Sequence, residues 1–538
     1  MSAVGAQART KLTALQARMN KNRRTSIGRR AGRIGLFAAV GSALGAGLIV
    51  AFAAYGFLRW ITPTSDVKAA PIDITRVALT VVAGVGGVVA LVIAYRRQRD
   101  LEQSKFVERF GAAAAHLGAT DVAVRIAGVY AMAGVADESD GLRRQQCIDV
   151  LCGYLRLPYT PELGGNHQTK EIRKYAPADP SNPENEQHFE YRQNDREVRK
   201  TIVRVIADHL RPEAESSWSA SNFDFRTAHL EDVDFSKAKF SGTAEFGGTT
   251  FSGTARFDEA TFSGGTRFSG ATFSGDAWFG GATFGGDAWF GGTTFSGDAG
   301  FRKATFSGDA EFTGATFGGG AGFTEATFSS AAGFRKATFS SAAEFSGTTF
   351  SSAAGFGGVT FSGDAWFGEA TFGGDAGFRK VTFSGDAWFR GTTFSSDAGF
   401  SGTTFGGDAG FRKATFSSAA GFRGTTFGGD AGFRGATFSS AAGFGEVTFS
   451  GDAEFTEVTF SGDAGFGGAT FSSTAEFSKV GFGGRTSFVG VDFGSERIGF
   501  AEPRRWGPPS PKFDWGEDGV GTPVNIDPQD WPPVAVAP

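Results

Sequence analysis

Residues 268–295 read FSGATFSGDAWFGGATFGGDAWFGGTTF, and this stretch shows a spacing that extends over about half of the chain. Successive phenylalanines stand five and then six residues apart, so one repeating unit spans eleven positions. The unit recurs 23 times from Phe246 to Phe493 without insertion or deletion, which explains why the 538 residues include 81 Gly and 58 Phe. Because so short a unit cannot bury its own ring, we expect the repeats to stack on one another.

Each phenylalanine follows a small residue by two positions, as Ala271 precedes Phe273 and Ala277 precedes Phe279. Side chains alternate between the two faces of a strand, so the small residue and the ring point inward and the residue between them points outward. Glycine, serine and aspartate between the short strands supply the turns. The pattern therefore predicts a β-solenoid whose interior is a dry column of phenylalanine rings.

The small-x-Phe/Leu-x-x pattern resembles the pentapeptide-repeat proteins, most clearly in 228–230 (Ala-His-Leu), 233–235 (Val-Asp-Phe) and 238–240 (Ala-Lys-Phe). The resemblance implies a right-handed quadrilateral β-helix over 221–500 with one pentapeptide per face and no shared catalytic residues. The alternating spacing fits a Phe-rich variant with 22-residue coils and an extra residue at two corners. About eleven coils would give a rod of roughly 55 Å. A flatter coil made of a single repeating unit is the alternative.

Two uncharged runs near the N-terminus, 34–58 and 77–95, predict a two-helix transmembrane hairpin over 34–95. At 1.5 Å per residue each run is long enough to cross a hydrocarbon core of roughly 30 Å. A cleaved signal peptide is a competing interpretation of the first run, which is too long and begins too late for one.

Basic residues precede the first run and follow the second, which predicts cytosolic termini and a multi-pass protein of the inner or plasma membrane, with the lipid bilayer as a partner. The basic cytosolic arm, 1–33, is placed to touch anionic headgroups. Gly41 and Gly45 form a face of small residues, which could pack against the second span or hold two copies of the chain together as a homodimer.

Two other segments lack the repeat. Residues 96–215 show helical periodicity and predict an α-helical linker domain. In 501–538, together with the preceding Phe500, the aromatic residues Trp506 and Phe513 are expected to cover the open end of the solenoid, and the Pro-rich remainder is expected to be disordered.

The sequence contains no recognisable catalytic, cofactor-binding or metal-binding motif, so we expect a non-enzymatic protein without a cofactor. Cys147 and Cys152 are interpreted as small buried residues of a helix. Asp276 and Asp287 belong to a series that recurs at the corners of the repeat, and such residues cap turns more often than they bind calcium.

These observations favour a membrane-anchored scaffold that presents an interaction surface to an unknown protein partner. The candidate surface consists of outward tryptophans, which are enriched at binding hot spots: Trp278, Trp289, Trp366 and Trp388.

Two alternatives concern the surface of the rod. The first is a DNA mimic that binds a topoisomerase, since 221–500 holds 29 acidic and 19 basic residues, a net charge of −10. The basic residues dilute that charge, and nucleic acid itself is not an expected partner. The second is an ice-binding solenoid, since 21 outward threonines recur once per repeating unit from Thr250 to Thr470.

Overall fold

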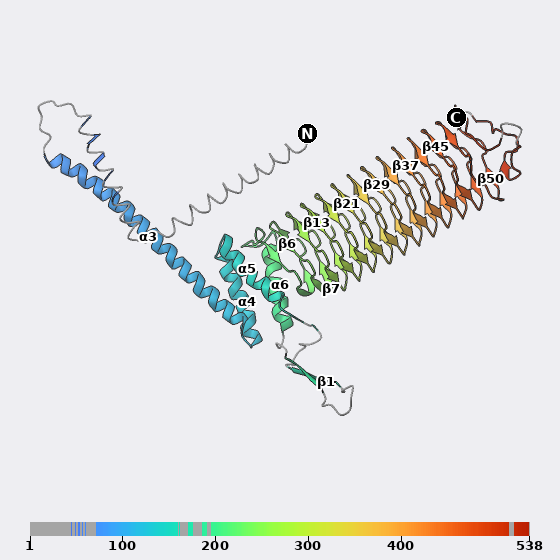
Figure 1. The fold of residues 1–538 in the computed structure, drawn as a ribbon. Coiled ribbons are helices and arrows are strands. Elements are labelled where there is room, and N and C mark those ends of the chain that lie inside the picture. Colours follow the sequence, from blue (N-terminus) through green and yellow to red (C-terminus); the bar gives the residue numbers. More distant parts are fainter. Residues whose placement is uncertain are drawn as a thin grey trace, which may run out of the picture. The chain divides into compact units, whose positions relative to one another are not determined.

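The computed structural model describes residues 71–159, 170–175, 185–190, 195–515 and 521–536, together with a few single residues between 45 and 60 and at 161. Two compact units make up the chain, 1–108 and 109–538. The described residues form four helices, a small hairpin and a long β-solenoid (Figure 1).

The predicted transmembrane hairpin is wrong. The run 77–95 does not form a separate span, because it lies within one helix of 47 residues, α3 (Pro71–Leu117), which continues through Arg96, Arg97 and Arg99. Among the residues that the structure describes, no helix combines the length and the apolar character needed to cross a membrane. Apart from single residues, the arm 1–33 and the run 34–58 lie outside the described residues. The membrane location and the cytosolic termini stay predictions.

Three further helices form the small helical region that precedes the solenoid: α4 (Val122–Asp137), α5 (Gly141–Leu155) and α6 (Asp195–Leu210). Asp121 caps the start of α4, since its carboxylate accepts a hydrogen bond from the Ala123 amide at 2.7 Å. The segment between α5 and α6 contains an antiparallel hairpin, β1 (Lys170–Tyr175) with β2 (Asn185–Glu190).

A buried polar network joins these three helices. Arg125 is fully buried in α4 and donates to Asp195 Oδ1 at 2.7 Å, and Tyr154 donates to the same oxygen at 2.5 Å. Arg199 donates to the other carboxylate oxygen at 2.9 Å. Because a charge buried among apolar groups needs a hydrogen-bonded counter-charge, Asp195 fixes how α4, α5 and α6 pack.

Side chains of α5 and of the residue that follows it bind the helical region to the first coil of the solenoid and to the segment that precedes it. Gln145 donates to the Asn222 carbonyl at 2.8 Å, and Arg144 donates to the Ser217 carbonyl at 2.9 Å. Arg156 forms an ion pair with Asp224. The helices therefore cap the phenylalanine column at its N-terminal end, as terminal units do in repeat proteins.

Parallel pairing joins residues about 22 positions apart, so one coil has 22 residues and four faces. Face 1 holds 13 strands from β3 (Phe223–Asp224) to β49 (Thr486–Ser487), and face 4 holds 13 from β5 (Lys239–Phe240) to β51 (Arg505–Trp506). Within the array nearly all of these strands have two residues.

Faces 2 and 3 share their first two strands, β4 (His229–Asp234) and β7 (Thr250–Arg256). Face 2 continues from β10 (Thr272–Phe273) to β46 (Thr470–Phe471). Face 3 continues from β11 (Ala277–Trp278) to β47 (Ala475–Glu476), then β50 (Ile498–Gly499) and β52 (Ile526–Asp527). The solenoid thus has about 13 coils, more than the eleven expected, because β3, β4 and β5 add a coil before Phe246 and β50, β51 and β52 continue the ladders beyond Phe493.

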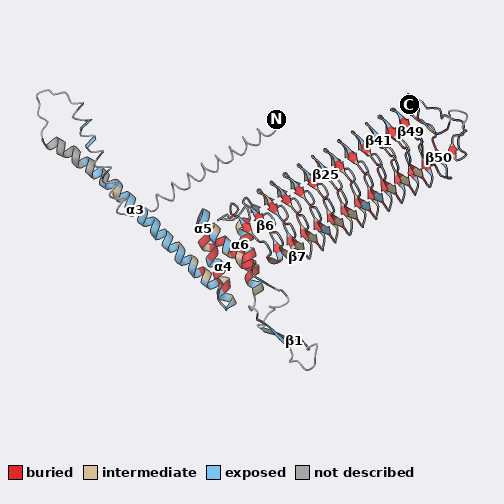
Figure 2. Ribbon diagram, viewed as in Figure 1, coloured by how far each residue is buried: buried red, intermediate tan, exposed pale blue. Residues whose placement is uncertain are grey.

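The interior of the solenoid is the predicted aromatic column, and its strands are buried along their whole inner side (Figure 2). Phe345 stacks on Phe323 and Phe367, the rings of the same face in the adjoining coils, with centroids 4.9 Å apart in both pairs. It meets Phe334 and Phe356 of face 1 edge to face, with centroids 5.6 Å apart. Both arrangements are favourable for aromatic pairs.

The two spacings correspond to two kinds of corner. At a five-residue step the chain makes a type II turn, in which the Ala282 amide donates to the Phe279 carbonyl at 3.1 Å and Gly281 has φ +64°. In the following coil Lys303 holds the same position with φ +58°. At a six-residue step the extra residue forms a wider corner, and Ser-Gly-Asp is its most frequent sequence, found at seven corners.

The C-terminal end of the column is covered by aromatic side chains. Phe513 stacks on Phe488 with a centroid distance of 4.7 Å, and Trp506 lies 6.0 Å from Phe500. Trp531, from the Pro-rich segment, meets Trp506 edge to face at 5.6 Å. The structure thus places residues from both parts of the tail over the last coil.

Candidate interaction surface

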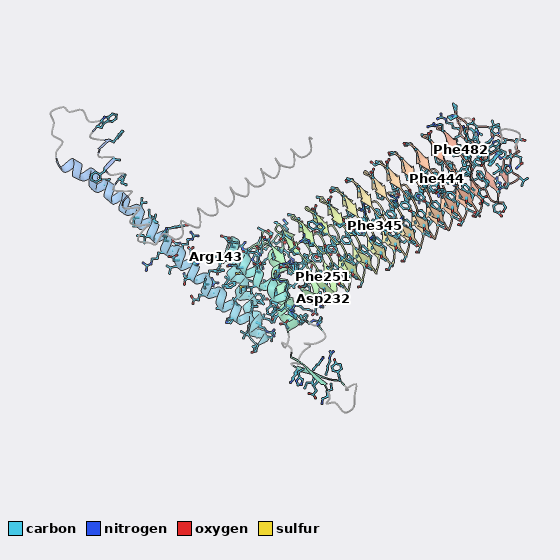
Figure 3. All side chains as sticks on the ribbon, in the orientation of Figure 1. Arg143, Asp232, Phe251, Phe345, Phe444 and Phe482 are labelled. Atoms are coloured by element: carbon cyan, nitrogen blue, oxygen red, sulfur yellow. The ribbon has the colours of Figure 1, made fainter. Side chains whose placement is uncertain are left out.

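The outward positions of the solenoid are the residues between each buried alanine and each buried phenylalanine. At β11, Ala277 and the residue after the strand, Phe279, are fully buried, and Trp278 is half-buried on the outside. Side chains line the coils along their length (Figure 3), although glycine occupies many outward positions on faces 1 and 3, such as Gly355 and Gly300. The outward positions therefore determine what each face presents to a partner.

The four predicted tryptophans do not form one surface. Trp366 on β27 (Ala365–Trp366) and Trp388 on β31 (Ala387–Trp388) are in register on adjacent coils of face 3. Trp278 lies on the same face, four coils earlier. Trp289, on β13 (Ala288–Trp289), belongs to face 1. The structure thus brings together only the Trp366–Trp388 pair.

All four indoles are half-buried, and the contacts of three show that they lie along the sheet. A Cβ atom placed on Gly410 would lie 2.5 Å from Trp388 Cε3, and one on Gly300 would lie 2.6 Å from Trp278 Cε3. Each of these indoles therefore rests on a backbone that has no side chain. Trp289 carries the Arg267 guanidinium 4.8 Å from its ring centroid, a cation–π contact.

One edge of face 3 carries a column of carboxylates at its six-residue corners. Five successive coils place an aspartate there, at positions 364, 386, 408, 430 and 452. The amide of each aspartate after the first donates to the Oδ1 of the preceding one, at 2.9–3.0 Å. These aspartates bridge successive coils, a contact that the sequence does not predict.

The opposite edge of face 3 carries arginines in three successive coils. Arg390, Arg412 and Arg434 hold the first central position of their type II turns, and all three are exposed. Arg434 lies 3.7 Å from the Glu457 carboxylate in the next coil. In the sequence, the pattern Asp-Ala-x-Phe-Arg contains one residue from each edge. That these residues form an acidic and a basic column becomes visible only when positions 22 residues apart are aligned.

The described polar groups outside face 3 do not indicate a metal site or a reactive thiol. Among the residues described, no three His, Cys, Asp or Glu side chains gather as a metal site would require. Burial raises the pKa of the Cys147 thiol to about 11 and that of the Cys152 thiol to about 12. Both thiols are therefore neutral and weakly nucleophilic at physiological pH.

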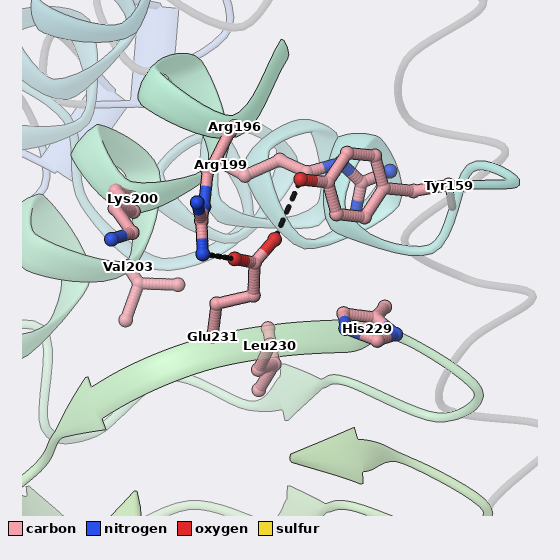
Figure 4. Close-up of a pocket in the computed structure, with 8 residues that line it drawn as sticks. All are labelled: Tyr159, Arg196, Arg199, Lys200, Val203, His229, Leu230 and Glu231. Carbon is pink, nitrogen blue, oxygen red and sulfur yellow. Dashed lines mark hydrogen bonds and ion pairs between the residues drawn. The ribbon is translucent and has the colours of Figure 1, made fainter. Parts of the chain in front are cut away.

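A hollow lies where α6 meets β4, and its polar side chains bind one another (Figure 4). Tyr159 donates to Glu231 Oε1 at 2.6 Å, and Arg196 pairs with the other oxygen. Burial and this hydrogen bond raise the pKa of Tyr159. The hollow measures about 10 Å³, which is at the lower limit for a single water molecule. The side chains that line it join the helical region to the solenoid.

Comparison with known protein families gives one match. The family description "Pentapeptide repeats (9 copies)" matches nine overlapping stretches: 225–272, 246–294, 279–327, 290–338, 312–360, 334–381, 356–404, 400–448 and 444–492. No curated protein and no solved structure matches the chain.

Proposed function

We propose, since residues 225–492 of this chain belong to the pentapeptide-repeat family, that the protein is a non-catalytic interaction rod. The solenoid supplies a rigid support on which outward residues are held in register. Partner binding then depends on the side chains of individual faces, because the interior is the same along the array.

The observation that carries this proposal is the pair Trp366 and Trp388 on adjacent coils of face 3. Trp388 lies against Gly410, and tryptophan side chains lose little conformational freedom on binding and supply large apolar area. Acidic and basic edges border the Trp388 coil, so the surface combines an apolar centre with a charged rim. Stable protein interfaces have this composition.

The experiment compares two variants of the full chain by crosslinking and affinity capture from its native cells. Trp366→Gly with Trp388→Gly removes the pair, and Trp289→Gly is the control on face 1. Glycine stands at the same outward position in other coils, so the fold tolerates it, which far-UV circular dichroism checks. A protein partner should be lost with the double variant and kept with the control. Retention of every partner by the double variant would refute the proposal.

The two alternatives have less support from the geometry. A topoisomerase-binding DNA mimic needs an acidic surface, and Arg390, Arg412 and Arg434 interrupt it on face 3. For ice binding, a regular exposed threonine array is needed, but most outward threonines, such as Thr349, are half-buried. Both stay hypotheses that a supercoiling assay and a thermal-hysteresis measurement test directly.

A further inference from the structure

Three consecutive coils of face 3 carry opposite charges at their two edges. The stretches 386–390, 408–412 and 430–434 all read Asp-Ala-x-Phe-Arg. Since coils stack about 4.8 Å apart, the acidic and the basic edges each form a column. Between them the outward positions are uncharged: Trp388, Gly410 and Gly432.

We propose that face 3 at β31, β35 (Ala409–Gly410) and β39 (Ala431–Gly432) binds the same face of a second copy of this chain, with the two rods side by side and parallel. This inference rests on the proposed function and adds to it, because it names a second copy of the chain as a partner for the Trp388 coil and the two coils after it.

The charge pattern is self-complementary in one orientation only. A twofold axis parallel to the rods places the acidic edge of one copy against the basic edge of the other at the same coil. Asp386 then faces Arg390 of the second copy, and the other two coils repeat the pairing on both edges. In an antiparallel pair aspartates would face aspartates and arginines would face arginines, and like charges across an interface repel.

The shape of the face allows close approach. Trp388 lies flat on Gly410, and nothing lies within 4 Å of a Cβ atom placed on Gly432. The twofold axis brings the two Trp388 indoles to the centre of the interface. Apolar groups there and ion pairs at the rim are the usual division of roles in a protein interface.

The neighbouring coils limit the extent of the pairing. Asp364 shares its coil with Glu369, and Asp452 shares its coil with Glu457, so both edges are acidic there. In the parallel arrangement these coils repel, which confines the attraction to the three coils between them. So small an interface belongs to the weak class, and we expect a Kd on the order of 10–100 μM.

Sedimentation equilibrium of the full chain at 0.15 M salt tests the proposal with two charge-reversed variants. One changes the three arginines at 390, 412 and 434 to aspartate. The other changes the three aspartates at 386, 408 and 430 to arginine. A corner of this kind accommodates arginine, since Arg485 occupies the equivalent position in another corner of the solenoid. Each variant alone should raise the Kd by about a hundredfold or more, and an equimolar mixture should associate again, because opposite edges then meet.

A matched control has the same change of net charge on another face. Arg335, Arg379 and Arg423 hold the same turn position at the edge of face 1. Their reversal to aspartate should leave the Kd of self-association unchanged. A wild-type chain that stays monomeric at several hundred micromolar would overturn the proposal, as would self-association that is equally sensitive to both sets of reversals, or a mixture that does not associate.

Cysteine crosslinking tests the orientation. Gly432→Cys places its thiol next to the same residue of the second copy in a parallel pair, so oxidation should give a covalent dimer. Gly421→Cys on face 1 is the control, since a Cβ atom there also meets nothing within 4 Å. Cys147 and Cys152 are buried and do not compete. Equal yields from the two variants would refute the orientation. If the rod is monomeric but Trp366 and Trp388 still recruit another protein, this inference fails and the proposed function stands.

Discussion

Replacing Phe345 by alanine should open the solenoid locally. The ring is fully buried and contacts five others: Phe323 and Phe367 at 4.9 Å, Phe334 and Phe356 at 5.6 Å, and Phe339 at 5.9 Å. A buried Phe→Ala change costs about 3–5 kcal/mol through lost burial and the remaining cavity. Since each coil contacts only its neighbours, this loss is concentrated in the coils around 323–367.

Hydrogen exchange measured by mass spectrometry reads this loss directly. The Phe345 amide donates to the Trp366 carbonyl at 2.6 Å, so its exchange requires the two coils to separate. A loss of 3–5 kcal/mol corresponds to exchange faster by about 150-fold to 5,000-fold for local opening. Peptides near Phe466, several coils away, should keep the wild-type rate.

Thr349→Ala is the matched control, because Thr349 lies one strand further along the same coil and points outward. We expect a change within about 0.5 kcal/mol, or less than about threefold in exchange rate. If both variants exchange alike, or if the effect of Phe345→Ala is equal at Phe466, the reasoning that ring burial stabilises each coil separately is wrong.

Three predictions concern the helical region, each with its own assay. Gly128→Ala should lower the melting temperature measured by circular dichroism, because a Cβ atom there would lie 2.7 Å from the amide nitrogen of residue 117. Gly134→Ala in the same helix is the control. A Cβ atom there meets nothing within 4 Å, so this change should be neutral or stabilising. Asp195→Ala should cost about 3–5 kcal/mol in urea unfolding, because buried Arg125 then loses the carboxylate to which it donates. Asp195→Asn should recover little of this loss. Cys152, with its pKa raised to about 12, should react with iodoacetamide at pH 8 only after unfolding, and rapid native labelling would contradict its burial.

The phenylalanine spacing predicts the solenoid because one ring per face is a strong and local constraint. It also predicts an extra residue at two of the four corners, whereas the type II turn at the five-residue steps is visible only in the structure. The spacing does not predict the ends. Ile498, Arg505 and Ile526 continue the ladders without the repeat, so the number of coils is underestimated.

The sequence does not predict the course of α3, because the apolar run 77–95 is only one part of that helix. Hydropathy identifies an apolar run but not where its helix ends, and α3 continues far beyond Tyr95. The candidate surface was predicted only in part. Outward tryptophans can be recognised from strand alternation, but which of them share a face depends on the 22-residue coil. The backbone hydrogen bonds of the aspartate column depend on the same alignment.

The equivalence of opposite corners has a genetic consequence. Loss or gain of one whole coil by recombination between near-identical segments would shorten or lengthen the rod by about 4.8 Å and leave every downstream side chain facing the same way. A change of half a coil, one repeating unit, would satisfy the aromatic interior equally well, yet it would rotate everything downstream by half a circumference, so that face 3 would continue as face 1. Evolution can thus turn part of the rod to the opposite side in a single event, without disturbing its core.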